Sequence, residues 1–320
     1  MPQIHISNLS KTYRVRRKKA GVKFRRELQL IHALQDISFD MDAGEIVGFI
    51  GPNGAGKSTT VKILSGILVP DSGRVEILGR VPWLKRSEHV AEIGVVFGQR
   101  TQLWWDVPII DSFELLRDIY SIFRTDYKAI LDRLVEVLDI ADLLETPLRQ
   151  LSLGQRMRCE LTASLLHAPR ILFLDEPTIG LDSSSKLQLR EYIAERNQKA
   201  GTTIILTTHD MDDIEAVCKR VVVIGKGRLL YDGSLDYLRR RYAPERKMMV
   251  TISGELPTEI PGARLHKAEG NTIELYFNNE ELPAPALIAR INQLCAVHDL
   301  TIENPNIDEV VSRMYNAEAI

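Results

Sequence analysis

A glycine-rich segment at residues 51–58 has the composition of a phosphate-binding loop. It matches the pattern G-x-x-x-x-G-K-[S/T] and lies between an apolar run and a helical pattern, the strand–loop–helix context that such a loop requires. Glycines let consecutive backbone N–H groups turn toward phosphate oxygens, and the start of the following helix favours negative charge. Lys57 would place its charge on the β- and γ-phosphates, and Ser58 would offer Mg²⁺ a hydroxyl. The predicted nucleotide-binding residues are Gly51, Pro52, Asn53, Gly54, Ala55, Gly56, Lys57, Ser58 and Thr59.

Two acidic residues, Asp175 and Glu176, follow the apolar run 171–174. Carboxylates at the carboxyl end of a strand in the same sheet as a phosphate loop can hold Mg²⁺ and accept a proton from attacking water. We assign Asp175 to the metal and Glu176 to the general base. By itself an acidic pair after a strand is as often structural, so the phosphate loop carries this interpretation.

Short apolar runs indicate the elements that position these residues. Such runs, bounded by Gly, Pro and charged residues, are typical of strands buried in a largely parallel sheet, which predicts an α/β fold. Between residues 99 and 169 the apolar residues instead recur at helical spacing, which predicts a helical subdomain at about 100–168. The runs lie at residues 45–50, 93–97, 171–174, 203–207 and 221–224.

The pattern changes after residue 233. Alternating apolar and polar residues at 272–277 predict a half-buried strand, and helical spacing follows at 287–295. We therefore predict a nucleotide-binding domain at residues 1–240 and a small α+β domain at 241–320.

Composition excludes several other classes of protein. Of 320 residues, 44% are hydrophobic and 26% are charged, and the net charge is −2, so neither disorder nor bulk binding of nucleic acid is expected. The three cysteines, Cys159, Cys218 and Cys295, are far apart and indicate neither a disulfide framework nor a zinc site. No run approaches the roughly 18 apolar residues of a membrane-spanning helix, so any membrane role is expected to come through a partner.

One local stretch is strongly basic. Between Lys11 and Arg26 nine residues are Lys or Arg and none is acidic. Such a run is most often a solvated loop, and contact with anionic lipid or an acidic partner is the alternative.

With these motifs in place, the chain resembles the ATP-binding cassette (ABC) ATPases from residue 3 to about residue 233. The segment Leu151-Ser152-Leu153-Gly154-Gln155 is similar to the signature of that family, usually LSGGQ, with Leu153 in place of a glycine. The resemblance implies a P-loop NTPase fold of ABC type and the cofactors ATP and Mg²⁺. It also implies that Ser152, Gly154 and Gln155 contact nucleotide.

Further positions match the family in sequence order. The resemblance implies that Tyr13 stacks on adenine, that Gln99 contacts Mg²⁺ and the attacking water, and that His209 contacts the γ-phosphate. It likewise implies that Asp182 belongs to the loop that signals across a dimer. Without the family, each would be read as an ordinary structural residue. The implied catalytic residues are Glu176, His209 and Gln99, and the implied metal ligands are Ser58, Gln99 and Asp175.

The family arrangement implies a dimer, in which the signature of one cassette covers ATP held by the phosphate loop of another. The partner cassette would be identical or a related ATPase, and separate permease subunits would cross the membrane. Trp104 and Trp105 fall where the family docks its permease, and burial of both inside the helical subdomain is the competing interpretation.

The expected function is an ATPase subunit that powers transport, with export favoured because one cassette and a small C-terminal domain resemble the ABC-2 type of bacterial exporter. Its expected place is the cytoplasmic face of the inner membrane, held there by the permease. The alternative is an ABC ATPase acting on ribosomes or DNA. It is disfavoured because we find one phosphate loop, one signature and no long heptad run.

Overall fold

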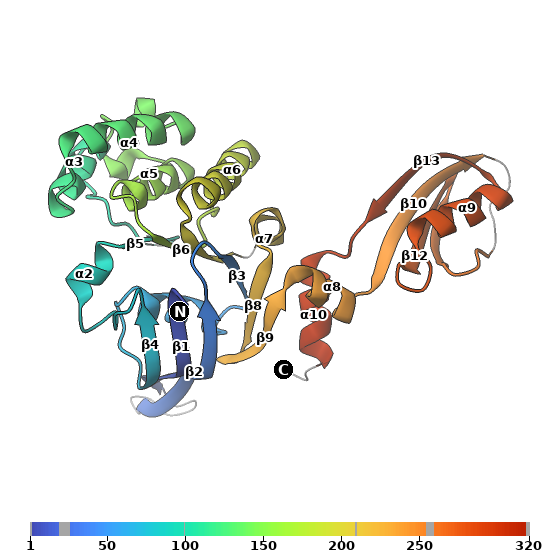
Figure 1. Ribbon diagram of the computed structural model, residues 1–320, viewed down its shortest axis with the longest axis horizontal. Coiled ribbons are helices and arrows are strands. Elements are labelled where there is room, and N and C mark those ends of the chain that lie inside the picture. Colours follow the sequence, from blue (N-terminus) through green and yellow to red (C-terminus); the bar gives the residue numbers. More distant parts are fainter. Residues whose placement is uncertain (1, 19–25, 99, 209, 254–258, 318–320) are drawn as a thin grey trace. The chain divides into compact units, whose positions relative to one another are not determined.

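The computed structural model describes residues 2–18, 26–98, 100–208, 210–253 and 259–317 (Figure 1). The chain divides into two compact units, Met1–Gly233 and Ser234–Ile320. The predicted domains 1–240 and 241–320 differ from these units by seven residues and remain a prediction.

A six-stranded sheet in the order β5-β6-β7-β3-β8-β9 forms the centre of the first unit. Pairing is parallel from β5 through β8, and these strands are almost completely buried, which explains why each is a continuous apolar run in the sequence. The predicted α/β class is confirmed. The strands are β3 (Ile46–Ile50), β5 (Ile93–Phe97), β6 (Ile171–Asp175), β7 (Thr203–Thr207), β8 (Arg220–Gly225) and β9 (Arg228–Ser234).

A second, antiparallel sheet in the order β2-β1-β4 comprises β1 (Ile4–Lys18), β2 (Arg26–Met41) and β4 (Ser72–Ile77). The β1–β2 ladder runs from Ile4 opposite Met41 to Lys18 opposite Arg26, with register shifts between Ile6 and Thr12. The loop expected over the basic stretch is therefore wrong for residues 11–18, which continue β1. Residues 19–25 of that stretch lie outside the described residues.

One hydrophobic cluster joins the two sheets of the first unit. It includes Ile4 and Ile6 of β1, Phe39 of β2 and Phe49 of β3, all buried. The rings of Phe39 and Phe49 meet edge to face with centroids 5.3 Å apart. The strands that carry the acidic pair and the phosphate loop thus rest on a shared core.

Helices complete the first unit, and three of them form the predicted helical subdomain. In Figure 1, α3, α4 and α5 gather beyond β5 and β6, on the side away from the antiparallel sheet, and α5 contacts both α3 and α4. Short 3-10 turns at Ala141–Leu143 and Leu148–Gln150 connect α4 to α5. The α-helices are α1 (Lys57–Leu64), α2 (Arg86–Val90), α3 (Ile109–Ile119), α4 (Arg124–Val137), α5 (Leu153–Leu165), α6 (Ser183–Ala200) and α7 (Met211–Val217).

The second unit contains an antiparallel sheet in the order β11-β12-β10-β13. Its core packs Met248, Val250 and Ile273 of the sheet against Leu287 and Ile291 of a helix. This agrees with the predicted alternation at 272–277 and the helical spacing after 287. The elements are α8 (Leu235–Tyr242), β10 (Glu245–Ser253), β11 (Arg264–Glu269), β12 (Thr272–Asn278), α9 (Ala284–Leu294), β13 (Ala296–Glu303) and α10 (Ile307–Ala317).

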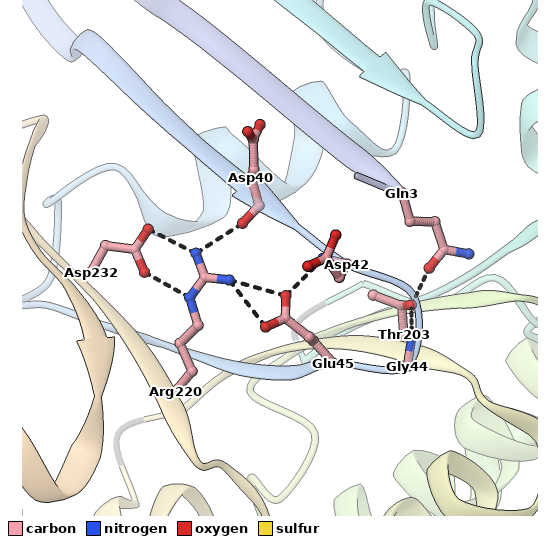
Figure 2. Close-up of polar contacts among 8 residues, drawn as sticks. All are labelled: Gln3, Asp40, Asp42, Gly44, Glu45, Thr203, Arg220 and Asp232. Carbon is pink, nitrogen blue, oxygen red and sulfur yellow. Dashed lines mark hydrogen bonds and ion pairs between the residues drawn. The ribbon is translucent and has the colours of Figure 1, made fainter. Parts of the chain in front are cut away.

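Arg220, at the start of β8, links both sheets of the first unit (Figure 2). Its guanidinium donates two hydrogen bonds of 2.8 Å, one to each carboxylate oxygen of Asp232, and a third of 2.8 Å to the carbonyl oxygen of Asp40 in β2. Glu45 accepts at 3.0 and 3.2 Å. The hydrogen bond with Asp232 and the charge of Asp232, followed by the charge of Glu45, raise the pKa of Arg220 above its ordinary value. Thr203 makes a second link: its hydroxyl accepts from the Gly44 N–H at 2.9 Å and donates to the side-chain oxygen of Gln3.

Replacing Arg220 with methionine is expected to lower the free energy of unfolding of the first unit by about 1.5–3 kcal/mol, the usual worth of hydrogen bonds to a charged group. Stability falls for two reasons. The hydrogen bonds of the guanidinium are lost, and Asp232 and Glu45 remain partly buried without their shared cation. Urea denaturation followed by tryptophan fluorescence measures the loss of stability, since Trp83, Trp104 and Trp105 all lie in this unit. Arg228→Met, at an exposed position of β9, is the control, and equal losses in both variants would contradict the assigned role.

Candidate functional site

The glycine-rich segment is a loop between β3 and α1, as its pattern predicts. Gly56 caps α1 with φ +116°, and a Cβ there would lie 2.6 Å from the carbonyl oxygen of Ala33, so only glycine fits. Gly56 has no side chain to cap the helix, and an anion can take that place. The loop can therefore bind phosphate through backbone N–H groups at the start of α1.

Lys57 is folded back onto the loop that it belongs to. Its ammonium donates to the carbonyl oxygen of Gly51 and, at 3.3 Å, to that of Pro52, and only 6% of the residue is exposed. Burial lowers the pKa of Lys57 below its ordinary 10.5, while the charges of Glu176 and Asp175 oppose that shift. A bound phosphate would add a counter-charge beside this buried cation.

Ser58 and Asp175 lie together, although 117 positions separate them in the sequence. The Ser58 hydroxyl is 3.3 Å from Oδ1 of Asp175, which also accepts a hydrogen bond from Thr207. A hydroxyl and a carboxylate are hard oxygen donors, and Mg²⁺ binds one or two such protein ligands together with phosphates and water. The pair therefore fits Mg²⁺, and nucleotide and water would complete the coordination.

Glu176 takes an unusual backbone conformation directly after β6. Its φ is +58°, a left-handed value that is uncommon for a residue other than glycine, and its N–H donates to the carbonyl oxygen of Thr207 at 2.8 Å. Such strain clusters at functional sites, where the surrounding structure holds it in place. The conformation supports a functional assignment for Glu176.

A cavity of about 330 Å³ brings these residues together. Asn53 and Ser58 of the loop line it, opposite Asp175 and Glu176. Lys62 and Arg100 add two cations that the sequence analysis did not assign. In the sequence, Lys62 follows the phosphate loop closely and Arg100 is adjacent to Gln99, and these positions could have suggested a role. Gln99 and His209 themselves lie outside the described residues, so their assignments stay predictions.

Tyr13, on β1, lies beside the phosphate loop. Its hydroxyl is 3.5 Å from the hydroxyl of Thr59 in the first turn of α1, and the side chain is partly exposed. The hydroxyl of Tyr13 therefore lies beside the start of α1, and stacking of its ring on adenine stays a prediction.

The signature-like segment forms the start of α5. Ser152 caps this helix: its hydroxyl accepts from the Gln155 N–H at 3.3 Å, while the Gln155 side chain accepts from the Ser152 N–H at 2.9 Å. A Cβ on Gly154 would lie 2.7 Å from the carbonyl oxygen of Gly180, so glycine is needed for close contact with the loop before Asp182. These residues do not line the 330 Å³ cavity of their own chain, as far as the described residues show.

Asp182 caps α6 and accepts a hydrogen bond of 2.8 Å from the Ser185 N–H. Hydrogen bonds from Ser185 lower its pKa, so the carboxylate is well stabilised in its charged form. The loop that precedes it lies against the start of α5, where Gly180 closely approaches Gly154.

Comparison with known proteins identifies clear relatives. The model of the family described as "ABC transporter" matches residues 34–179, which include the phosphate loop, the start of α5 and the acidic pair. The methionine import ATP-binding protein MetN of Latilactobacillus sakei subsp. sakei (strain 23K) is 31% identical over 281 residues, which are 84% of this chain and 81% of that protein. The daunorubicin resistance ATP-binding protein DrrA3 of Streptomyces coeruleorubidus is 29% identical, with 87% of this chain and 89% of that protein covered.

A solved structure described as the ATP-binding subunit of an ABC transporter has the same fold. Its TM-score is 0.65 at 26% sequence identity, and the match covers 75% of this chain and 93% of that chain. Among the described residues, no helix is long and apolar enough to span a membrane.

Proposed function

Because this chain belongs to the family of ABC transporter ATP-binding proteins, we propose that it hydrolyses ATP to power export through separate permease subunits. ATPase activity and the binding of ATP and Mg²⁺ are properties of the family as a whole. The observation that carries the proposal for this chain is the shared cavity, where loop residues face Asp175 and Glu176.

In the proposed mechanism the loop binds the phosphates first. Backbone N–H groups at the start of α1 contact phosphate oxygens. The ammonium of Lys57 gives up its hydrogen bonds to the carbonyl oxygens of Gly51 and Pro52 and donates to phosphate oxygens instead. Ser58 and Asp175, together with Gln99, would hold Mg²⁺, which when bound neutralises charge on the β- and γ-phosphates. Tyr13 would stack on the adenine.

Glu176 is proposed to orient the attacking water and accept its proton. Its carboxylate is acceptor-only when ionised, and it lines the cavity beside the phosphate site. His209 is proposed to contact the γ-phosphate from the segment after β7. Most of the rate acceleration would come from positioning and from stabilising charge at the γ-phosphate.

Cassettes of this family dimerise and work with membrane permease subunits. We infer that Ser152, Gly154 and Gln155 of one chain contact the ATP that another chain holds. Their absence from the cavity lining of their own chain, within the part of the molecule described, supports this arrangement. Whether the second cassette is identical or related, a complete site then needs two chains.

Export is proposed over import on two grounds. The resemblance to ABC-2 exporters rests on one cassette followed by a small second unit, and two relatives are named for resistance to daunorubicin and to linearmycin. Import is the second candidate, because MetN relatives are named for methionine import. The proposed location is the cytoplasmic face of the inner membrane, with the permease as the attachment.

Trp104 and Trp105 are proposed as part of the permease contact. They are 40% and 47% exposed, so the alternative of burial inside the helical subdomain is wrong. Exposed aromatic residues of this size are typical anchors of protein interfaces.

A pull-down from the native cells tests the function. Tagged Glu176→Gln protein, purified in mild detergent with and without ATP, is expected to retain a polytopic membrane protein. The same protein carrying Trp104→Ala and Trp105→Ala should retain at least tenfold less of it, as expected on loss of interface anchors worth about 1.4 kcal/mol or more. Recovery of ribosomes or DNA-processing proteins without any membrane protein would favour the soluble alternative. An additional extracytoplasmic binding protein would favour import.

A further inference from the structure

A buried carboxylate on α5 binds the segment that follows Gln99. Glu160 is only 4% exposed, and its carboxylate accepts hydrogen bonds from the Thr101 hydroxyl and, at 3.2 Å to each oxygen, from the Gln102 N–H. The side-chain amide of Gln102 donates to the Glu160 carbonyl oxygen at 3.2 Å. The turn at 101–103 therefore has a specific anchor on the helix.

The buried Glu160 carboxylate is energetically unfavourable unless its hydrogen-bond donors stay in place. Burial raises the pKa of Glu160, while the hydrogen bonds from Thr101, Gln102 and Leu103 oppose that shift. A buried carboxylate that loses these donors is left desolvated without compensating hydrogen bonds, which destabilises it. The turn and the helix are thus expected to move together.

A second contact joins the same two segments one helical turn earlier. The guanidinium of Arg156 lies over the ring of Trp105, 4.5 Å from its centroid. Arg156 and Glu160 are four residues apart, so they share one face of α5. The Trp105 carbonyl oxygen also accepts from the Arg149 N–H at 3.1 Å, just before α5.

The helix that makes both contacts begins at the signature-like segment. At 1.5 Å per residue, Arg156 and Glu160 lie about 6 and 12 Å along the axis from Ser152. A rigid helix of this length transmits a displacement from one contact to another, whereas a flexible loop would absorb it.

We propose that Arg156 and Glu160 are positioning residues that join the 101–105 segment to the start of α5. Binding of the permease at Trp104–Trp105 and binding of ATP at the signature are then energetically coupled. The inference rests on the proposed function, in which Trp104 and Trp105 contact the permease and the signature contacts ATP. Coupling of two binding events is reciprocal. ATP-driven closure must therefore change the surroundings of Trp104 and Trp105 even without a permease.

Tryptophan emission of the full chain measures this coupling. The parent carries Trp83→Phe, which leaves Trp104 and Trp105 as its tryptophans, and Glu176→Gln to prevent turnover. Mg-ATP titration is followed by emission, by a fluorescent ATP analogue for affinity and by light scattering for dimer formation. The expected result is a fractional emission change whose midpoint coincides with ATP binding.

Glu160→Ala and Arg156→Met are expected to lose at least half of that fractional change, with ATP affinity altered less than threefold. Glu160→Gln should retain more of it than Glu160→Ala, because an amide oxygen still accepts from the Gln102 N–H. Arg158→Met is the matched control: it lies on the same helix, but its guanidinium contacts Leu138 and Asp139 and not the 101–105 segment, among the contacts described.

Several outcomes would overturn the inference. A parent that binds ATP and dimerises without any emission change would refute it, as would a full response in Glu160→Ala or a loss as large in Arg158→Met. If Glu160→Ala does not fold, Glu160→Gln and Arg156→Met decide the question. Failure of the parent to bind ATP would instead contradict the proposed function, so the two hypotheses fail separately.

Discussion

Glu176→Gln is expected to reduce ATP turnover by about 10²- to 10⁴-fold, the usual contribution of a general base. Glutamine preserves the shape of the side chain and cannot take the proton, so ATP affinity should change less than threefold. Since ATP then stays bound, the variant should accumulate as a closed dimer. Phosphate release measures turnover, and light scattering with Mg-ATP measures the dimer.

The control for this variant is Glu191→Gln, the same change at an exposed position of α6. It should keep turnover within twofold of the wild type. Turnover of Glu176→Gln above about one fifth of the wild-type rate would show that another group accepts the proton.

Lys57→Met is expected to weaken ATP binding roughly 10- to 150-fold, which corresponds to about 1.5–3 kcal/mol for hydrogen bonds to a charged group. The protein without nucleotide should be no less stable than the wild type. The reason is that burial lowers the pKa of Lys57, so at neutral pH the folded state bears the cost of a desolvated charge.

Thermal unfolding with and without Mg-ATP distinguishes these two effects. At saturating ATP the wild type should gain a few degrees by mass action, and Lys57→Met should gain almost nothing. The pH dependence has a definite sign: the unfolded chain keeps the Lys57 proton to higher pH, so stability from this group rises as pH approaches 10.5, and Lys57→Met removes that rise. Lys62→Met, in the same helix and cavity, is the control and should lose less affinity. Equal losses would contradict a special role for Lys57.

The parallel sheet was predictable because its strands are buried on both faces. The run 93–97 is apolar throughout and coincides with β5, and the same reasoning places β7. The β1–β2 pairing was not predictable in this way. Arg14 and Arg16 lie opposite Leu30 and Leu28 in the ladder, so β1 contains part of the basic run that its charge had assigned to a loop.

Some residues of the site belong to a local sequence pattern, and others are brought into place only by tertiary structure. The phosphate loop is a local pattern, so its residues could be assigned from spacing alone. Glu160 could not, since a glutamate within a helical pattern is normally exposed, and its burial depends on donors about sixty positions earlier.

The cap on α5 has a consequence for the entropy of dimer closure. The Ser152 hydroxyl accepts the Gln155 N–H through a lone pair, and a hydroxyl that accepts in this way keeps its own proton for another acceptor. The cap thereby fixes the oxygen before any ligand arrives, and only the O–H rotor remains to be oriented. A phosphate of ATP bound to a second chain would meet a Ser152 hydroxyl whose oxygen is already immobilised. Little conformational freedom of this side chain would then be lost when the two cassettes meet.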